Sequence, residues 1–249
     1  GESGIGSVVF KPKDIASEQE ALALLKRQPY WGRDLIVVEE FTAADLPVSP
    51  SVEVFVPPLH TGEPAVTYVC EQLFRGPGEF SGVIVSADLR ERPWYEPCVG
   101  SALTIARQLQ RRGYAGHFDL DAVVDGDGRP RLLEINARRT GGTHVHDFAT
   151  FAFGPDYLER VALLSWESIH SAGITDYTGL RTALDDLLYP IGGSPRGVIL
   201  TITSSLQHHQ FGVLIAGDAA ADAVALQTAL LDRIQQHANA KTADAPSYI

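Results

Sequence analysis

The sequence has no methionine, and Cys70 and Cys98 are the only cysteines among its 249 residues. Two isolated cysteines cannot form a disulfide framework or a cysteine zinc site, so we expect buried or free thiols in a reducing compartment. No apolar run approaches the ~20 residues of a membrane span, and the N-terminus lacks the basic start and apolar stretch of a signal peptide. We therefore expect a soluble, cytoplasmic protein.

Basic residues are also scarce, with 20 Lys and Arg against 31 Asp and Glu and a formal net charge of −11. A surface this acidic argues against non-specific binding to nucleic acid or to anionic lipid. The P-loop pattern GxxxxGK[ST] and the nucleophile elbow GxSxG are both absent, which argues against P-loop NTPases and serine hydrolases of that type. Apolar residues make up 45% and charged residues 20%, as in an ordinary globular protein.

Strand-like and helix-like segments are mixed without a regular βαβ alternation, which favours an α+β fold with a largely antiparallel sheet and flanking helices. A capping box of Ser17 and Glu20 predicts a helix that Pro29 ends. The segment 42–51 is the best internal boundary. We expect strands at 34–41, 51–57, 65–73, 116–124, 131–137, 198–203 and 210–216, and helices at 97–112, 156–166, 178–188 and 221–237.

The most informative stretch is GHFDLDAVVDGDGRPRLLEINARRTGG, residues 116–142. If Asp127–Gly128 forms a two-residue hairpin turn, Asp121 lies opposite Glu134. The same register places Asp119 opposite Asn136. Because side chains alternate along a strand, Asp121, Glu134 and Asn136 then share one face, with neighbouring Cβ atoms about 4.5–5.5 Å apart.

Two carboxylates and an amide oxygen at this spacing are hard ligands, and their natural partner is Mg²⁺, one ion or two. Arg138 would point the same way and could stabilise charge on a phosphoryl group. The alternative is a solvated hairpin with its acids outward, which the apolar LL and AVV segments argue against. A calcium loop fails because Arg129 stands where an EF-hand needs an acid or Asn.

The pattern of Asp121, Glu134–Ile135–Asn136 and Arg138 resembles the metal site of the ATP-grasp enzymes, which include D-alanine–D-alanine ligase. The opening GESGIGSVVF resembles the phosphate-covering loop of that fold, and VVEEF resembles its adenine-holding strand and hinge. The resemblance covers roughly residues 1–150. SPSVEVFVP and LLEINARRTGGTHVHDFA are most similar to the peptide-forming ligases of the pheganomycin type.

This resemblance implies an ATP- and Mg²⁺-dependent ligase, with Mn²⁺ as an alternative metal, that joins a carboxylate to an amine through an acyl phosphate. Asp121, Glu134 and Asn136 would hold the metal, and Arg138 would be the catalytic arginine. ATP would be held by two further segments, namely Gly4, Ile5, Gly6 and Ser7 in the loop, and Glu39, Glu40, Phe41 and Thr42 at the hinge.

The partners expected are ATP and a small acid and amine, such as an amino acid or peptide, without nucleic acid or membrane; a homo-oligomer stays open. Substrate contacts are expected from Arg139, Gly141 and Gly142. Arg75 could clamp a substrate carboxylate, or it is simply an exposed loop arginine. We read His144 and His146 as lining a polar loop rather than as metal ligands.

The expected division is 1–45 as the remainder of a small ATP-grasp subdomain, 46–150 as the core subdomain with the metal site, and 151–249 as a C-terminal α/β lobe. The family's lysine on a strand before the glycine-rich loop has no counterpart, since the chain opens within that motif. We therefore expect an N-terminally truncated chain. A non-catalytic nucleotide-binding fragment and an ATP-grasp enzyme of another reaction type remain the alternatives.

Overall fold

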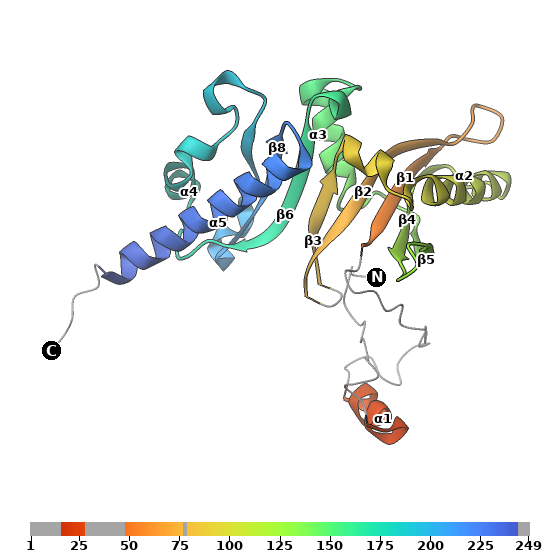
Figure 1. Cartoon of the computed structure of the whole chain (residues 1–249), viewed down its shortest axis with the longest axis horizontal. Coiled ribbons are helices and arrows are strands. Elements are labelled where there is room, and N and C mark those ends of the chain that lie inside the picture. Colours follow the sequence, from red (N-terminus) through yellow and green to blue (C-terminus); the bar gives the residue numbers. More distant parts are fainter. Residues whose placement is uncertain (1–15, 28–47, 77–78, 244–249) are drawn as a thin grey trace.

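A computed structural model describes residues 16–27, 48–76 and 79–243 of the chain (Figure 1). Its helices are α1 (Glu18–Lys26), α2 (Tyr95–Arg111), α3 (Thr143–Phe153), α4 (Tyr177–Ala183) and α5 (Ala220–Ala243). Its strands are β1 (Pro50–Val56), β2 (Ala65–Gly76), β3 (Glu79–Val85), β4 (Gly116–Val124), β5 (Pro130–Asn136), β6 (Ala162–His170), β7 (Gly197–Ile202) and β8 (Gln210–Gly217).

The eight strands form one antiparallel sheet in the order β5-β4-β1-β2-β3-β6-β8-β7. This confirms the α+β class and the largely antiparallel sheet. The strands that follow residue 160 extend the same sheet beyond β3, because β6 pairs with β3 through Ile84–Leu164 and Val85–Leu163. The order is not sequential, since β1 pairs with β4 across more than sixty residues.

Helix boundaries follow the signals in the sequence. The Ser17 hydroxyl accepts from the Glu20 backbone N–H at 3.2 Å and caps α1, as the capping box predicts. Helix α2 buries Cys98, Ala102 and Ala106 along one stripe. Gly113, with φ at +90°, follows it, a conformation that glycine adopts without strain.

The two faces of the sheet are covered differently. Helix α2 packs over β1 and helix α5 over β6 and β8, on the face that carries Val52, Leu120, Ile84 and Ile215. Figure 1 shows these two helices at opposite ends of the sheet. Helix α3 covers the middle of the other face, where Val145 and Ala149 join a cluster with side chains of β2, β3, β6 and β8. On that second face, the β1, β4 and β5 end carries acids.

The helix expected at 156–166 is wrong, because Tyr157–Glu159 forms a short 3₁₀ turn and Ala162–His170 is strand β6. Leu163 and Leu164 point to opposite faces of the sheet and are both buried, Leu163 beneath α3 and Leu164 on the α5 face. A strand buried on both faces is apolar at consecutive positions, and such a run is easily mistaken for a helix. Within the described residues no helix is long and apolar enough to span a membrane.

Candidate functional site

The hairpin of β4 and β5 brings the metal-site candidates together. Asp121 lies opposite Glu134, and Asp119 lies opposite Asn136, which confirms the predicted register. The β4 strand is tied on its other side to β1, where Ser51 faces Asp121 and Glu53 faces Asp119. Four carboxylates therefore gather on one face of three neighbouring strands.

The two-residue turn on which that register was predicted is wrong. The N–H of Asp125 donates to the Arg129 carbonyl at 2.9 Å, and Val124 pairs with Pro130, so three residues form the turn. The Asp125 carboxylate accepts from the backbone N–H groups of Asp127 and Arg129 and stabilises the turn. A β-bulge between Asp121 and Ala122 restores the expected register, because it adds one residue on β5.

The Asp121 and Glu134 carboxylates converge on a single point. The Asn136 side-chain Nδ2 donates to Asp121 Oδ2 at 2.8 Å and to Glu134 Oε1 at 3.2 Å. The other Asp121 oxygen accepts from Gln72 Nε2 at 2.7 Å. The partial positive charge of one amide thus sits between two carboxylates, where a bound cation would be held more strongly. The amide orientation is assigned from these bonds, and with a cation present the oxygen would turn inward.

Burial disfavours the charged form of the two aspartates on β4. It raises the pKa of Asp121 to about 6, with the neighbouring Glu134 carboxylate adding to the rise. Burial likewise raises the pKa of Asp119 to about 7, and the Glu53 and Asp121 carboxylates contribute to it. The Arg138 guanidinium acts in the opposite sense on both groups. Such a cluster is stabilised by a cation.

Arg138 lies next to this cluster, as the sequence predicts. Its guanidinium Nη2 donates to Asn136 Oδ1 at 3.4 Å, and Nη1 donates to the Arg139 carbonyl at 3.2 Å. The Arg138 side chain is otherwise exposed, so its remaining donors can reach a ligand. Arg139 instead forms an ion pair with Asp147 on α3.

The glycines that follow have steric reasons to be small. A Cβ on Gly142 would collide with the Tyr68 hydroxyl, and one on Gly141 would press on the Phe80 ring at 3.3 Å. Both glycines let the loop between β5 and α3 lie close to the sheet. Their role as substrate contacts stays a prediction.

Glu53 is the acid that the sequence reasoning missed. It is fully buried on β1 and accepts from Thr67 Oγ1 at 2.9 Å and from Thr143 Oγ1. His117 Nδ1 lies 2.9 Å from its Oε1. The alternation of SVEVFV places Ser51 and Glu53 on one face, a signal that a period-2 reading could have used.

Other candidates are placed less favourably. Arg75 Nη1 donates to the carbonyls of Glu167 and Ser168 at 3.1 and 2.7 Å, so these donors are already used. His144 and His146 lie in helix α3 rather than in a loop, and His146 Nδ1 lies 3.1 Å from the Tyr157 hydroxyl. The glycine-rich loop and hinge candidates lie outside the described residues, namely Gly4, Ile5, Gly6, Ser7, Glu39, Glu40, Phe41 and Thr42.

The acidic face fits Mg²⁺ through its chemistry. Across the part of the chain that the structure describes, no three His, Cys, Asp or Glu side chains form a group able to hold a metal. The candidate set is two carboxylates and one amide, and Mg²⁺ commonly takes few protein ligands and completes its shell with water and phosphate oxygens. Hard oxygen atoms converging on one point are what such an ion requires.

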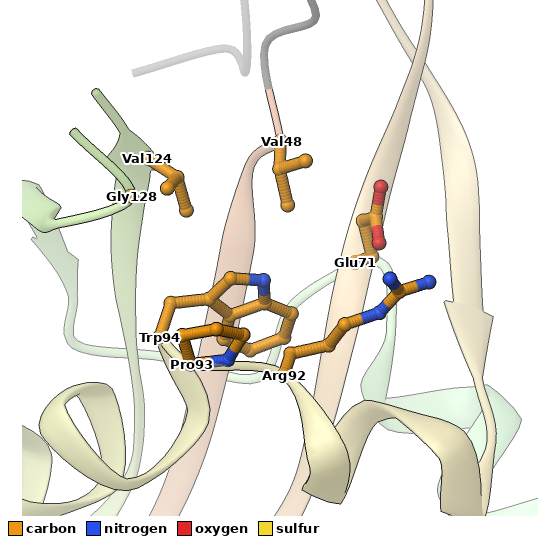
Figure 2. Close-up of a pocket in the computed structure, with 7 residues that line it drawn as sticks. All are labelled: Val48, Glu71, Arg92, Pro93, Trp94, Val124 and Gly128. Carbon is orange, nitrogen blue, oxygen red and sulfur yellow. The ribbon is translucent and has the colours of Figure 1, made fainter. Parts of the chain in front are cut away.

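A pocket of about 250 Å³ opens on the opposite face of the sheet (Figure 2). Trp94 and Pro93 form its floor, with Arg92 and Glu71 at one side and Val48 above. The acids of the hairpin do not line this pocket. We assign the candidate site to the acidic face because charged groups converge there.

No protein-family model matches the sequence, and no curated protein matches it. Solved structures do match it. A carboxyaminoimidazole ribonucleotide synthase from Aspergillus clavatus, complexed with ATP, is 12% identical over 80% of this chain and 52% of that chain, with a TM-score of 0.52. A biotin carboxylase from Campylobacter jejuni is 12% identical over 81% of this chain and 50% of that chain, with a TM-score of 0.53.

The fold is therefore that of part of the ATP-grasp enzymes, a class of ATP-dependent carboxylases and synthetases. A 2-oxoglutarate carboxylase domain from Hydrogenobacter thermophilus, in complex with MgADP and bicarbonate, matches with a TM-score of 0.50 at 12% identity, over 76% of this chain and 46% of that chain. The chain spans about half the length of these structures. At such identities the likeness concerns the fold alone.

Proposed function

We propose that this chain is part of an ATP-grasp ligase that joins a carboxylate to an amine and forms ADP. The observation that carries the proposal is the convergence of Asp121 and Glu134 on the Asn136 amide, with Arg138 beside them. An ATP-grasp fold with an oxygen-ligand site on the β4–β5 hairpin is suited to binding Mg·ATP. The peptide-ligase type rests on the sequence resemblance after the metal strand.

In this proposal Asp121, Glu134 and Asn136 hold Mg²⁺, which neutralises phosphate charge when bound. A carboxylate oxygen of the acid substrate attacks the γ-phosphorus, and the bond to the ADP oxygen breaks. The amine nitrogen then attacks the acyl carbon, phosphate leaves, and the nitrogen loses a proton. The chain needs no nucleophile of its own for these steps, so its residues act by positioning and by charge stabilisation.

Within this scheme Arg138 stabilises charge on the phosphoryl oxygens and on the acyl phosphate. The glycine-rich loop and the hinge would cover the phosphates and the adenine, and residues 1–45, 46–150 and 151–249 would be small subdomain, core subdomain and C-terminal lobe. Arg75, Arg139, Gly141 and Gly142 are the proposed substrate contacts. The acid and amine are small molecules, amino acids or peptides in the first instance.

One observation favours a second candidate function. The three solved structures named above are all enzymes whose names describe carboxylation or carboxylated products, and one holds bicarbonate. Bicarbonate is itself a carboxylate-like nucleophile toward the γ-phosphate, so the same face could serve a carboxylation. The two candidates differ in the acid they activate.

The test begins with Mg·ATP titrated into the chain by calorimetry. ADP release is then followed with pairs of amino acids, and separately with bicarbonate plus an amine. We expect Mg·ATP binding, and ADP release that requires both an acid and an amine. Binding with ADP release only in bicarbonate would favour the carboxylase, and binding without turnover would favour a non-catalytic nucleotide-binding module. Absence of Mg·ATP binding would contradict all three.

A further inference from the structure

Two buried carboxylates lie beside the candidate metal set without belonging to it. Glu53 is 0% exposed and Asp119 is 4% exposed, and they face each other across β1 and β4. Among the described residues the only ion-pair partner of Glu53 is His117, and Asp119 has none. The Oδ1 atom of Asp119 is buried and accepts no hydrogen bond from the described residues.

Such an arrangement costs stability. Burying a carboxylate without a cation or a full set of donors costs several kcal/mol, and apolar residues at the same sheet positions are often more favourable. Residues that oppose folding in this way concentrate at functional sites. The hydrogen-bond partners of Glu53 and Asp119 indicate which function this is.

Both carboxylates hold the same loop. Glu53 Oε2 accepts from Thr143 Oγ1, and Asp119 Oδ2 accepts from Thr140 Oγ1. The two threonines are themselves linked, because the Thr140 backbone N–H donates to Thr143 Oγ1 at 2.9 Å. The Tyr68 hydroxyl lies 3.5 Å from Thr140 Oγ1 on the sheet side.

This loop joins the metal strand to α3 and carries Arg138. Arg138 lies two residues before Thr140 and two residues after Asn136. The Arg138 guanidinium makes no ion pair with any described residue, so its place over Asp121 and Glu134 depends on the backbone that carries it. Two threonine hydroxyls on buried carboxylates fix that backbone to the sheet.

We propose that Glu53 and Asp119 are positioning residues that act through Thr143 and Thr140 to hold Arg138 over the acidic face. The inference rests on the proposed function, and names the residues that set the geometry of its arginine. Glu53 and Asp119 touch no substrate in this scheme. Their effect reaches the phosphoryl group only through the loop.

The first measurement is hydrogen exchange in the chain without ligand. Thr143→Val removes the hydroxyl that links Glu53, the loop and the Thr140 N–H, whereas Thr143→Ser keeps it. We expect the Thr140 amide to exchange about tenfold or more faster in Thr143→Val and to return to the wild-type rate in Thr143→Ser. Thr150→Val on the same helix is the matched control, because the Thr150 hydroxyl is buried without a partner.

The second measurement separates positioning from general stability. Mg·ATP reports the ground state, and Mg·ADP with fluoroaluminate mimics the phosphoryl group in transfer. We expect Thr143→Val to weaken the fluoroaluminate complex about ten- to a hundredfold and Mg·ATP much less, since a displacement of about 1 Å can cost that much. Thr143→Val in an Arg138→Ala background should add little, because the hydroxyl acts through the arginine.

Each outcome decides one of the two proposals. Unchanged exchange at Thr140 in Thr143→Val overturns the loop clamp. Faster exchange with equal losses for both nucleotide complexes, or with full additivity to Arg138→Ala, overturns the positioning role. Failure of the wild-type chain to bind Mg·ATP contradicts the proposed function instead, and the exchange rates still decide whether the clamp exists.

Discussion

Asp121 and Glu134 repel each other across β4 and β5, and the shared Asn136 amide only partly offsets this repulsion. A divalent cation would neutralise both groups at once. Of the two acids Glu134 is the more exposed, so it can be changed with little effect on packing. It is therefore the better residue for testing the metal site.

Glu134→Gln is expected to weaken Mg·ATP binding by about 10- to 100-fold while the folded fraction stays the same, because one anionic ligand becomes a neutral amide. Calorimetry measures the affinity, and thermal unfolding checks the fold. Asp127→Asn is the matched control, since Asp127 is an exposed acid at the turn of the same hairpin. Equal affinity in Glu134→Gln and in the control would remove Glu134 from the metal set.

The raised pKa values of Asp119 and Asp121 give a pH dependence with a definite sign. Their folded-state pKa values of about 7 and about 6 exceed the ordinary value of 3.8, so between about pH 4 and 7 the folded chain binds more protons than the unfolded chain. The free energy of unfolding attributable to these groups therefore falls as pH rises through that window.

We expect Asp119→Asn to reduce this fall, because an amide keeps an acceptor for Thr140 and carries no charge. The measurement is urea unfolding of the metal-free wild type and variant at pH 5 and pH 7.5. The difference between the two chains removes the common effect of the net charge of −11. A variant that loses stability relative to wild type on going from pH 5 to pH 7.5 would give the sign assigned here the lie.

The sequence could predict the metal set at the level of single residues, because Asp121, Glu134 and Asn136 lie on one hairpin whose short connection fixes the pairing. Glu53 was out of reach for a different reason. Its contact with Asp119 depends on β1 pairing with β4, and nothing local in the sequence specifies which strand becomes a neighbour. The clamp on Thr140 and Thr143 is likewise long-range.

At the scale of elements, period and length predicted most strands and helices, and the failures share a cause. Strand β6 was read as a helix because it is buried on both faces, and α3 was read as a loop because its first turn is THVH after two glycines. The turn of the β4–β5 hairpin was misread as well, and the bulge at Leu133 compensated. Tertiary packing decides each of these cases.

The contact between β3 and β6 joins the two halves of the sheet and is made close by Gly82. A Cβ there would overlap the Ser165 carbonyl oxygen, and φ is +156°. The Ser165 hydroxyl also accepts from the Val83 N–H at 3.0 Å. The junction between the halves therefore has no room for a side chain at position 82.

Gly82→Ala is accordingly expected to lower the free energy of unfolding by about 3 kcal/mol or more, from overlap with backbone and from strained φ. Gly100→Ala is the control, because a Cβ on Gly100 in helix α2 meets nothing within 4 Å, and alanine should stabilise by up to about 1 kcal/mol. Urea unfolding measures both. A mild effect for Gly82→Ala would mean that β3 and β6 can separate at little cost.

At the scale of the whole molecule, the strand order could not be predicted, since it depends on which distant segments meet. Three apolar clusters hold the sheet, one beneath α2, one beneath α5 and a third beneath α3. The third cluster contains Tyr68 and Cys70 of β2 together with Leu214 and Ala216 of β8. It connects the acidic end of the sheet with the end formed after residue 160.

Because of this connection, a ligand bound at β4 and β5 should stabilise the far end of the sheet as much as the near end. Mg·ATP at 100 times its dissociation constant is expected to raise the free energy of unfolding by about 2.7 kcal/mol, which slows globally controlled exchange about 100-fold. Hydrogen exchange at Leu120 in β4 and at Leu214 in β8 measures this, with Mg²⁺ alone and ATP alone as controls. Slower exchange at Leu120 without any change at Leu214 would show that the two ends unfold separately. Unchanged exchange at both would speak against Mg·ATP binding itself, and hence against the ligase, whereas equal slowing at both ends supports a single cooperative unit built around the acidic face.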